Sequence, residues 1–172
     1  MIGLFFGCQN ILPFKNRELS QSWYFFLIEY VTIMYFYLHI PFCRQKCPYC
    51  KFALTPVFDS FKKKRYIKYL QEEIGEYFRQ NSSDITTLYF GWWTPSVLSL
   101  EEVKEILESF PAYRSAQEIS FESNPEDITY EYARWLFDLW INRLSLGVQT
   151  LNDISLKEIH RSSRTSIIQA LT

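Results

Sequence analysis

The feature of this sequence that most constrains its fold is an alternation of strand and helix that occurs four times after residue 34. Short runs rich in β-branched and aromatic residues are each followed by a polar segment and then by a longer segment of helical periodicity. The expected strands are Tyr35–Ile40, Thr86–Phe90, Glu118–Glu122 and Arg143–Val148. Strands joined through helices pair in parallel, so the sequence predicts an α/β fold with a parallel sheet.

Helices are expected after each of these strands. Ser99 and Glu102 form a capping box, in which each side chain satisfies a backbone donor near the other residue. Four βα units do not close an eight-stranded barrel. We therefore expect the N-terminal part of a partial (β/α) barrel whose later units are missing, with an open sheet as the alternative. The expected helices are about Ser60–Arg79, a segment opening at Ser99, about Tyr130–Leu139 and a segment opening near Asp153.

The cysteines are unevenly placed, with one at position 8 and three within eight residues. Cys43, Cys47 and Cys50 follow the first expected strand with C-x3-C-x2-C spacing and lie too close together for independent disulfides. Such a cluster indicates metal or iron–sulfur ligation in a reducing compartment, so we expect a cytoplasmic protein. Zinc, with His39 or His160 as fourth ligand, is the alternative.

The composition excludes several classes of protein. A formal net charge of −1, with 22% charged and 48% apolar residues, is that of an ordinary globular chain and argues against a nucleic-acid-binding arm. The apolar stretch Trp23–Phe42 has the length of a membrane span, but Glu29 near its middle argues against one. Met34 directly precedes the first expected strand. We therefore expect residues 1–33 to be a non-native or disordered upstream extension and residues 34–172 to form the N-terminal portion of the barrel.

Four motifs in order, each at the end of an expected strand, carry a family resemblance. The segment Tyr37–Cys43 and the cysteine loop resemble the start of a radical S-adenosylmethionine (SAM) enzyme of the oxygen-independent coproporphyrinogen III oxidase family. Leu88–Ser96 is similar to its glycine-rich turn, Glu122–Pro125 to its acidic strand end and Asn142–Gln149 to its fourth strand. The resemblance covers about residues 35–161.

The resemblance implies a cofactor site. Cys43, Cys47 and Cys50 would bind three irons of a 4Fe–4S cluster, and SAM would chelate the open iron. Electron transfer would then cleave the sulfonium bond of SAM. Residues at matching positions would bind the cofactor, although without the resemblance each would be read as a packing or surface residue. They are Tyr37, Tyr49, Gly91, Trp92, Trp93, Thr94, Glu122, Gln149 and Arg161.

Within the family, the segment Cys47–Phe52 reads C-P-Y-C-x-F and resembles the heme chaperone (HemW-like) branch. Porphyrinogen-decarboxylating members usually carry a further cysteine two positions after the last one, where this chain has Phe52. The resemblance therefore implies a protein that binds heme and delivers it to a respiratory protein. The alternatives are a coproporphyrinogen III oxidase that decarboxylates a porphyrinogen, an inactive relative and a zinc-binding module. The electron donor is not indicated.

Tryptophan stands at three positions where the family has glycine, namely Trp92, Trp93 and Trp140. Indole rings there would fill the space of the cofactor, whereas glycine permits a close backbone approach. The chain has only 5 glycines in 172 residues, against about 7% in ordinary proteins. We therefore hypothesise that a codon written here as tryptophan encodes glycine in the source organism. Trp23 and Trp135 are further positions at which the same codon could stand.

Overall fold

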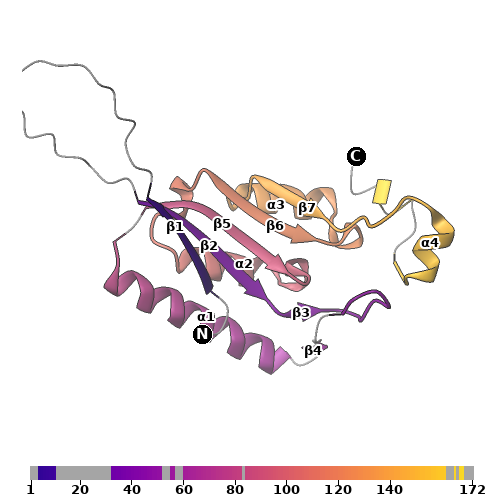
Figure 1. Ribbon diagram of the computed structural model, residues 1–172, viewed down its shortest axis with the longest axis horizontal. Helices are drawn as coiled ribbons and strands as arrows, with labels where there is room; N and C mark the ends of the chain where they lie inside the picture. Colours follow the sequence, from indigo (N-terminus) through magenta and orange to yellow (C-terminus); the bar gives the residue numbers. More distant parts are fainter. Residues whose placement is uncertain are drawn as a thin grey trace, which may run out of the picture.

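The computed structural model describes residues 4–10, 32–51, 55–56, 60–82, 84–161, 165 and 167–168. Its main sheet has five strands in the order β1-β2-β5-β6-β7 (Figure 1). The last four are parallel and β1 is antiparallel to β2. The α/β fold with a parallel sheet is therefore confirmed. The strands are β1 (Leu4–Asn10), β2 (Thr32–Ile40), β5 (Ile85–Trp92), β6 (Glu118–Ser123) and β7 (Arg143–Leu146).

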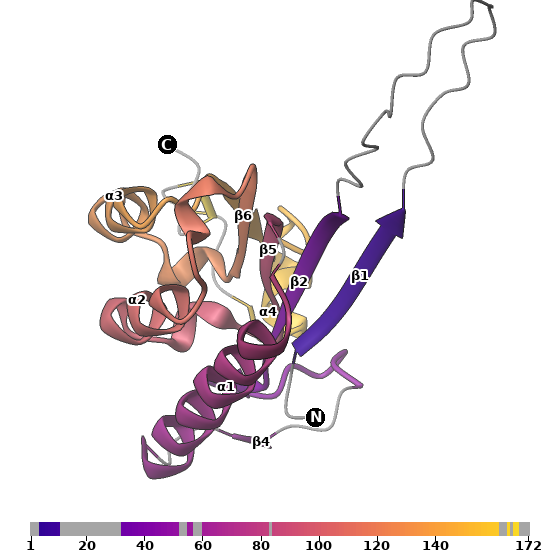
Figure 2. The ribbon, with the colours of Figure 1, turned by 90° about the vertical axis from the view of Figure 1, so that its left-hand side faces the viewer.

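Three helices cover one face of this sheet, as the edge-on view in Figure 2 shows. They are α1 (Ser60–Gln80), α2 (Leu100–Glu108) and α3 (Tyr130–Asp138). The fourth helix, α4 (Asp153–Glu158), lies beyond the carboxyl ends of the strands (Figure 1). All four helices lie where the sequence predicts them. Short 3-10 turns, η1 (Pro95–Val97), η2 (Tyr113–Ser115) and η3 (Pro125–Asp127), complete the connections.

The core forms between the sheet and these helices because apolar residues alternate along the strands. In β2, Phe36, Leu38 and Ile40 are almost fully buried, while Tyr37 and His39 between them are more accessible. The ring of Phe36 lies 5.4 Å, centroid to centroid, from those of Tyr77, Phe78 and Phe110. Each such pair adds about 0.5–1.5 kcal/mol beyond its buried area. Helix α1 contributes Ile67, Leu70 and Ile74, and helix α2 contributes Val103, Ile106 and Leu107.

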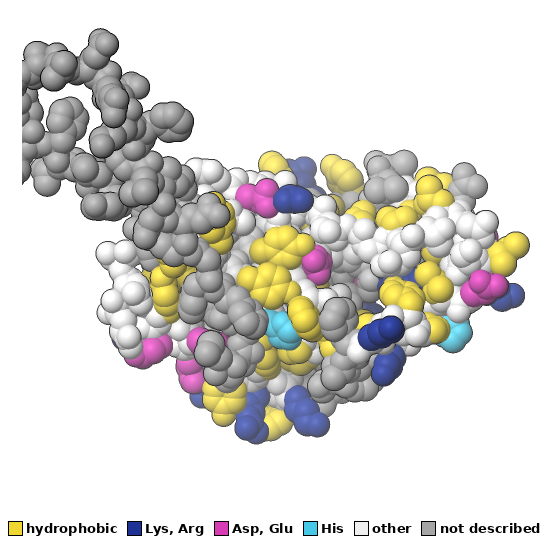
Figure 3. Space-filling view, viewed as in Figure 1, with side chains coloured by type: hydrophobic (Ala, Val, Ile, Leu, Met, Phe, Trp, Pro, Cys, Tyr) yellow, Lys and Arg dark blue, Asp and Glu magenta, His cyan; other side chains and the backbone are white. Residues whose placement is uncertain are grey.

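The opposite face of the sheet is not covered by α1, α2 or α3 (Figure 2). Hydrophobic side chains gather on this face over the central strands, as Figure 3 shows. The four parallel strands all point toward the same edge of the sheet, so the loops that follow them meet there (Figure 1). In α/β folds this carboxyl edge is where functional loops gather.

The structure differs from the expectations in three places. Strand β7 ends at Leu146, two residues early, because the Val148 amide turns back to donate to the Leu146 carbonyl. Strand β1 and the short parallel pair β3 (Phe42–Cys43) and β4 (Thr55–Pro56) are not among the expected strands. Whether residues 1–33 are an upstream extension stays a prediction.

The apolar stretch considered as a membrane span includes strand β2 in its second half. Residues 11–31 lie outside the described part of the chain. Among the residues that the structure describes, no helix is both long enough and apolar enough to cross a membrane.

Candidate cofactor site

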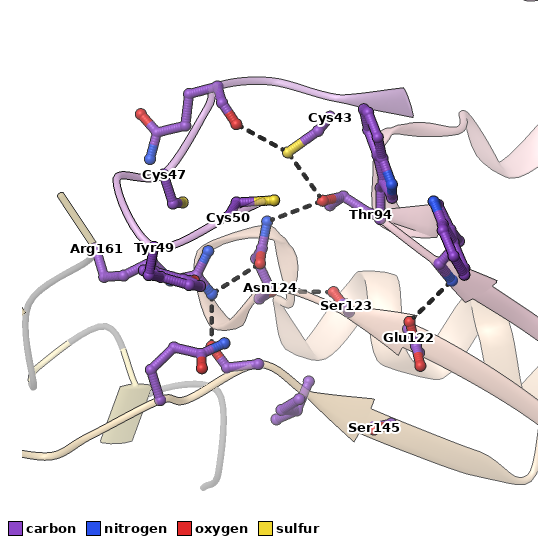
Figure 4. A pocket seen from close by; sticks show the side chains of 16 residues that line it. Cys43, Cys47, Tyr49, Cys50, Thr94, Glu122, Ser123, Asn124, Ser145 and Arg161 are labelled. Carbon is purple, nitrogen blue, oxygen red and sulfur yellow. Dashed lines mark hydrogen bonds between the residues drawn. The ribbon is translucent and has the colours of Figure 1, made fainter. Parts of the chain in front are cut away.

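A cavity of about 300 Å³ lies at the carboxyl edge of the sheet, where the four strand-end loops meet (Figure 4). Its volume is at the lower end of the range of ligand sites in proteins. The cysteine loop forms one wall, and the ends of β5, β6 and β7 form the others. It is lined by Cys43, Gln45, Cys47, Tyr49, Cys50, Trp92, Trp93, Thr94, Glu122, Ser123, Asn124, Ser145, Leu146, Gly147, Gln149 and Arg161.

The cysteine loop is held in place by hydrogen bonds to neighbouring segments. The Thr94 hydroxyl donates to Cys43 Sγ at 3.3 Å, and the Thr94 amide donates to the Phe42 carbonyl at 3.1 Å. Within the loop, the Cys50 amide donates to the Cys47 carbonyl at 3.0 Å and closes a turn. At its outer side, Gln45 Nε2 donates to the His160 carbonyl at 2.8 Å. The loop is thus tied both to the end of β5 and to the segment after α4.

The three cysteine thiols form a donor set that fits an iron–sulfur cluster. All three are free and line the same cavity. Across the described residues, no three His, Cys, Asp or Glu side chains are grouped closely enough to hold one ion. In a 4Fe–4S cluster each thiolate binds a different iron, so its ligands stand farther apart than those of one zinc ion. Three thiols in one cavity therefore suit a cluster in which three irons have protein ligands and the fourth is open.

Glu122 forms the wall opposite the cysteines. Its carboxylate accepts a hydrogen bond from the Tyr89 hydroxyl at 2.7 Å. It accepts another from the Trp92 amide at 3.2 Å (Figure 4). Burial, and next the hydrogen bond to Glu122, raise the pKa of Tyr89 to about 12, so this hydroxyl remains a donor at neutral pH. The two bonds fix the orientation of Glu122 and leave acceptor capacity for a ligand, since a carboxylate offers about four lone-pair directions.

Tyr37 and Gly91 do not line the cavity but support this wall. The Tyr37 ring stacks on Tyr89 with centroids 5.7 Å apart. Burial raises the pKa of Tyr37 well above its ordinary value. A Cβ atom at position 91 would approach the Tyr89 ring to 2.6 Å, so only glycine fits beside this ring as it stands. Both residues therefore act on the cavity through the Tyr89–Glu122 pair.

Arg161 places a buried cation at the far end of the cavity. Its side chain is 6% exposed. The guanidinium donates to Asn124 Oδ1 at 2.8 Å and to the Gly147 carbonyl (Figure 4). It also lies 4.0 Å from Glu126 Oε1. A planar guanidinium held in this way suits a carboxylate or another anionic group of a ligand.

The structure brings together all the sequence-predicted site residues except Tyr37 and Gly91, which lie behind the wall. Their roles stay predictions. Sequence reasoning did not select Gln45, Ser123, Asn124, Ser145, Leu146 or Gly147 as site residues. The strand-end position of Ser123 and Asn124 after β6, and of Gly147 after β7, was the available signal. His39 lies outside the lining, and burial lowers its pKa.

Comparisons with known proteins agree with this arrangement. Residues 37–172 match the model of the radical SAM superfamily. The chain is 34% identical over 141 residues to the oxygen-independent coproporphyrinogen III oxidase of Helicobacter pylori, covering 77% of this chain and 30% of the relative. It is 36% identical over 129 residues to the heme chaperone HemW of Lactococcus lactis, covering 73% and 33%. The chain thus spans about a third of the length of these relatives.

A solved structure is similar as well. Coproporphyrinogen III oxidase HemN from Escherichia coli, described as a radical SAM enzyme, superimposes with a TM-score of 0.68 at 29% identity. The match covers 78% of this chain and 32% of that one. The similarity therefore extends through most of the chain and agrees with the expected N-terminal part of a radical SAM barrel.

Proposed function

Because the chain belongs to the radical SAM superfamily, which implies a 4Fe–4S cluster and SAM, we propose that Cys43, Cys47 and Cys50 hold the cluster. The observation that carries this proposal is that the three thiols share one cavity with Glu122 and Arg161. When bound, the cluster would supply an electron to SAM. The polar side chains around the cavity are suited to bind and orient SAM.

The roles follow from the donors and acceptors that each wall presents. Glu122, already oriented by Tyr89 and the Trp92 amide, would accept hydrogen bonds from hydroxyl or amine groups of SAM. Arg161 would bind its carboxylate at the other end of the cavity. The Thr94 hydroxyl, which donates to Cys43 Sγ, would hold this thiol in position. Tyr49 and Gln149, which also line the cavity, would complete the contacts.

For the whole protein we propose a cytoplasmic heme carrier that delivers heme to a respiratory protein. Three features support this proposal: the C-P-Y-C-x-F form of the cysteine segment, the absence of a further cysteine in it, and the similarity to heme chaperone HemW of Lactococcus lactis. A reducing compartment is also the one in which cluster thiolates persist. The second candidate is oxidative decarboxylation of a porphyrinogen, which the Helicobacter pylori oxidase and the Escherichia coli structure favour.

Cluster binding is tested by anaerobic reconstitution of the chain with iron and sulfide, followed by iron analysis and spectroscopy. We expect about four irons per chain, as the cubane requires. Replacing Cys43, Cys47 and Cys50 together by alanine should abolish loading. Cys8→Ala is the matched control and should load normally, because Cys8 is outside the proposed ligand set. Equal loading of the triple variant would overturn the ligand assignment.

The two candidate functions are separated with the reconstituted protein. Heme is titrated while its absorbance is followed, and in parallel coproporphyrinogen III is added with SAM and a reductant while deoxyadenosine is measured. Stoichiometric heme binding without porphyrinogen turnover is the result expected of a carrier. Robust deoxyadenosine release coupled to loss of porphyrinogen would instead establish the oxidase and reject the carrier.

A further inference from the structure

Two tryptophans adopt backbone conformations that belong to glycine. Trp92 has a φ of 98° and Trp140 a φ of 69°. A positive φ brings Cβ against the carbonyl oxygen, so for a bulky side chain it is an outlier, whereas glycine adopts it freely. Within the described part of the chain, none of the glycines has a positive φ. Two tryptophans thus have backbone conformations typical of glycine, and none of the described glycines has one.

Position 140 ends helix α3 in a Schellman motif. The Ile141 amide donates to the Leu136 carbonyl at 3.0 Å, and the Trp140 amide donates to the Phe137 carbonyl at 2.9 Å. These are the two hydrogen bonds of the Schellman motif. The first residue after the helix cap, here Trp140, is usually glycine in this motif because its backbone must be left-handed. Ile141 and Leu136 are both buried, so the core holds the turn in this conformation. The Trp140 side chain is 54% exposed, which leaves it little packing to offset the strain.

Position 92 is constrained by the site itself. Its amide donates to Glu122 at 3.2 Å, which fixes the peptide orientation at the end of β5. A φ of 98° lies beyond the left-handed region near 57° that asparagine or aspartate can enter. The indole is 44% exposed, lies 4.8 Å from the His39 ring and lines the cavity. The backbone at position 92 is thus held by its hydrogen bond to Glu122, while the Trp92 side chain occupies part of the cavity wall.

The other non-glycine residues with positive φ have smaller or polar side chains: Ala112, Gln149 and His160. His160 is informative because it ends α4 in the same motif, with bonds from its amide to Lys157 and from the Arg161 amide to Leu156. Histidine is among the residues that enter this region more often, and tryptophan is not. Trp93 has no positive φ, but its buried Nε1 has no hydrogen-bond partner in the described part of the chain.

We infer that positions 92 and 140 are glycine in the protein made by its source cell, where the codon written as tryptophan is read as glycine. The inference stands on backbone geometry and does not depend on the proposed function. The low glycine content, 5 in 172 residues, agrees with it. Glycine at position 92 would keep the amide bond to Glu122 and remove an indole from the cavity wall.

Peptide mass spectrometry of the protein purified from its source tests the identity directly. Trypsin releases residues 80–104, which contain position 92, and residues 135–143, which contain positions 135 and 140. We expect each peptide to be lighter by at least one mass difference between tryptophan and glycine, with fragment ions that locate a change at positions 92 and 140 and report positions 93 and 135 separately. Tryptophan at either position would overturn the inference.

Stability tests the conformational premise on the recombinant chain. Trp140→Gly should raise the midpoint of thermal unfolding by about 2–4 °C, because it relieves the left-handed residue of a chain this long. Trp135→Gly is the matched control on the same helix, where glycine is unfavourable, and should lower the midpoint. His160→Gly, in the same motif, should shift it less than Trp140→Gly does. An equal fall for Trp135→Gly and Trp140→Gly would contradict the premise.

Discussion

Asp127 is a buried carboxylate that connects the cysteine loop to the loop after β6. Its side chain is 6% exposed, and it accepts a hydrogen bond from the Ser96 hydroxyl at 2.6 Å. Arg44, which lies between the cysteines, forms an ion pair with it at 3.1 Å. Burial raises the pKa of Asp127, while the Ser96 bond and Arg44 act in the opposite direction. Arg44 therefore both compensates the carboxylate and anchors the loop.

Arg44→Gln should destabilise the protein by about 1 kcal/mol, a modest loss because the arginine side chain is 63% exposed and screened by water. The free energy of unfolding is measured with urea on the full chain. Arg134→Gln is the matched control, because its pair with Asp138 spans 3.7 Å and both side chains are exposed. That control should change stability by less than about 0.5 kcal/mol. Similar losses in both variants would show that Arg44 has no anchoring role.

His39 gives the fold a pH dependence. Burial lowers its pKa from 6.5, so the folded state binds its proton less readily than the unfolded state. The stability that neutral His39 contributes is full above pH 6.5 and is lost as the pH falls toward the lower folded-state pKa. Chemical unfolding at pH 7.5 and below should therefore show a decline for the unchanged chain and a shallower one for His39→Gln. A slope unaltered by His39→Gln would contradict this account.

Spacing alone grouped Cys43, Cys47 and Cys50, because residues of one short loop are necessarily neighbours. Asn124 and Gly147 could not be selected in the same way. Their place in the cavity depends on the register of β5, β6 and β7, and on the hydrogen bonds from Arg161 that join them. For a residue brought to the cavity by such long-range pairing, the sequence shows only that it follows a predicted strand.

At the scale of elements, the starts of α2, α3 and α4 could be predicted because a capping residue precedes each of these helices. Ser99 caps α2 with both bonds of the capping box, as the sequence predicts. Thr129 caps α3 and Asn152 caps α4, each by accepting from the backbone amide three residues further along the chain. The two-residue strands β3 and β4 were not predictable, because a single parallel pairing between distant segments leaves no periodicity.

Ser99→Ala should lower the free energy of unfolding by about 1 kcal/mol, because the Glu102 amide loses the Ser99 hydroxyl as its acceptor. The reciprocal bond from the Ser99 amide to the Glu102 carboxylate then no longer forms part of a complete capping box. Urea denaturation of the full chain measures the loss. Ser109→Ala, at the other end of α2, is the control. Its hydroxyl only donates to the Glu105 carbonyl of the preceding turn, a bond that adds little to stability. An equal cost at both ends would argue against the capping box as the source.

At the scale of the whole molecule, the hydrophobic core and the candidate cofactor cavity lie in different parts of the fold. The described buried apolar cluster extends from Met34 to Ile141 and lies on the helix side of the sheet. The cavity lies at the carboxyl edge, on loops that this core supports. Residues 1–33 include β1, which pairs along the outer edge of β2 and contacts α1. This arrangement allows the expectation that the folded unit begins near Met34 to be tested.

A chain that begins at Met34 should keep cooperative unfolding and iron loading, because the described core and the cavity lie within it. It should also self-associate more readily, since removing β1 leaves the backbone donors and acceptors of β2 unpaired at a sheet edge. Circular dichroism during heating reports the first property and light scattering at several concentrations the second. Phe6→Pro in the full-length chain is the control that weakens the β1–β2 pairing without shortening the chain, and it should raise scattering in the same direction. Loss of cooperative unfolding in the shortened chain would instead make residues 1–33 part of the folded unit.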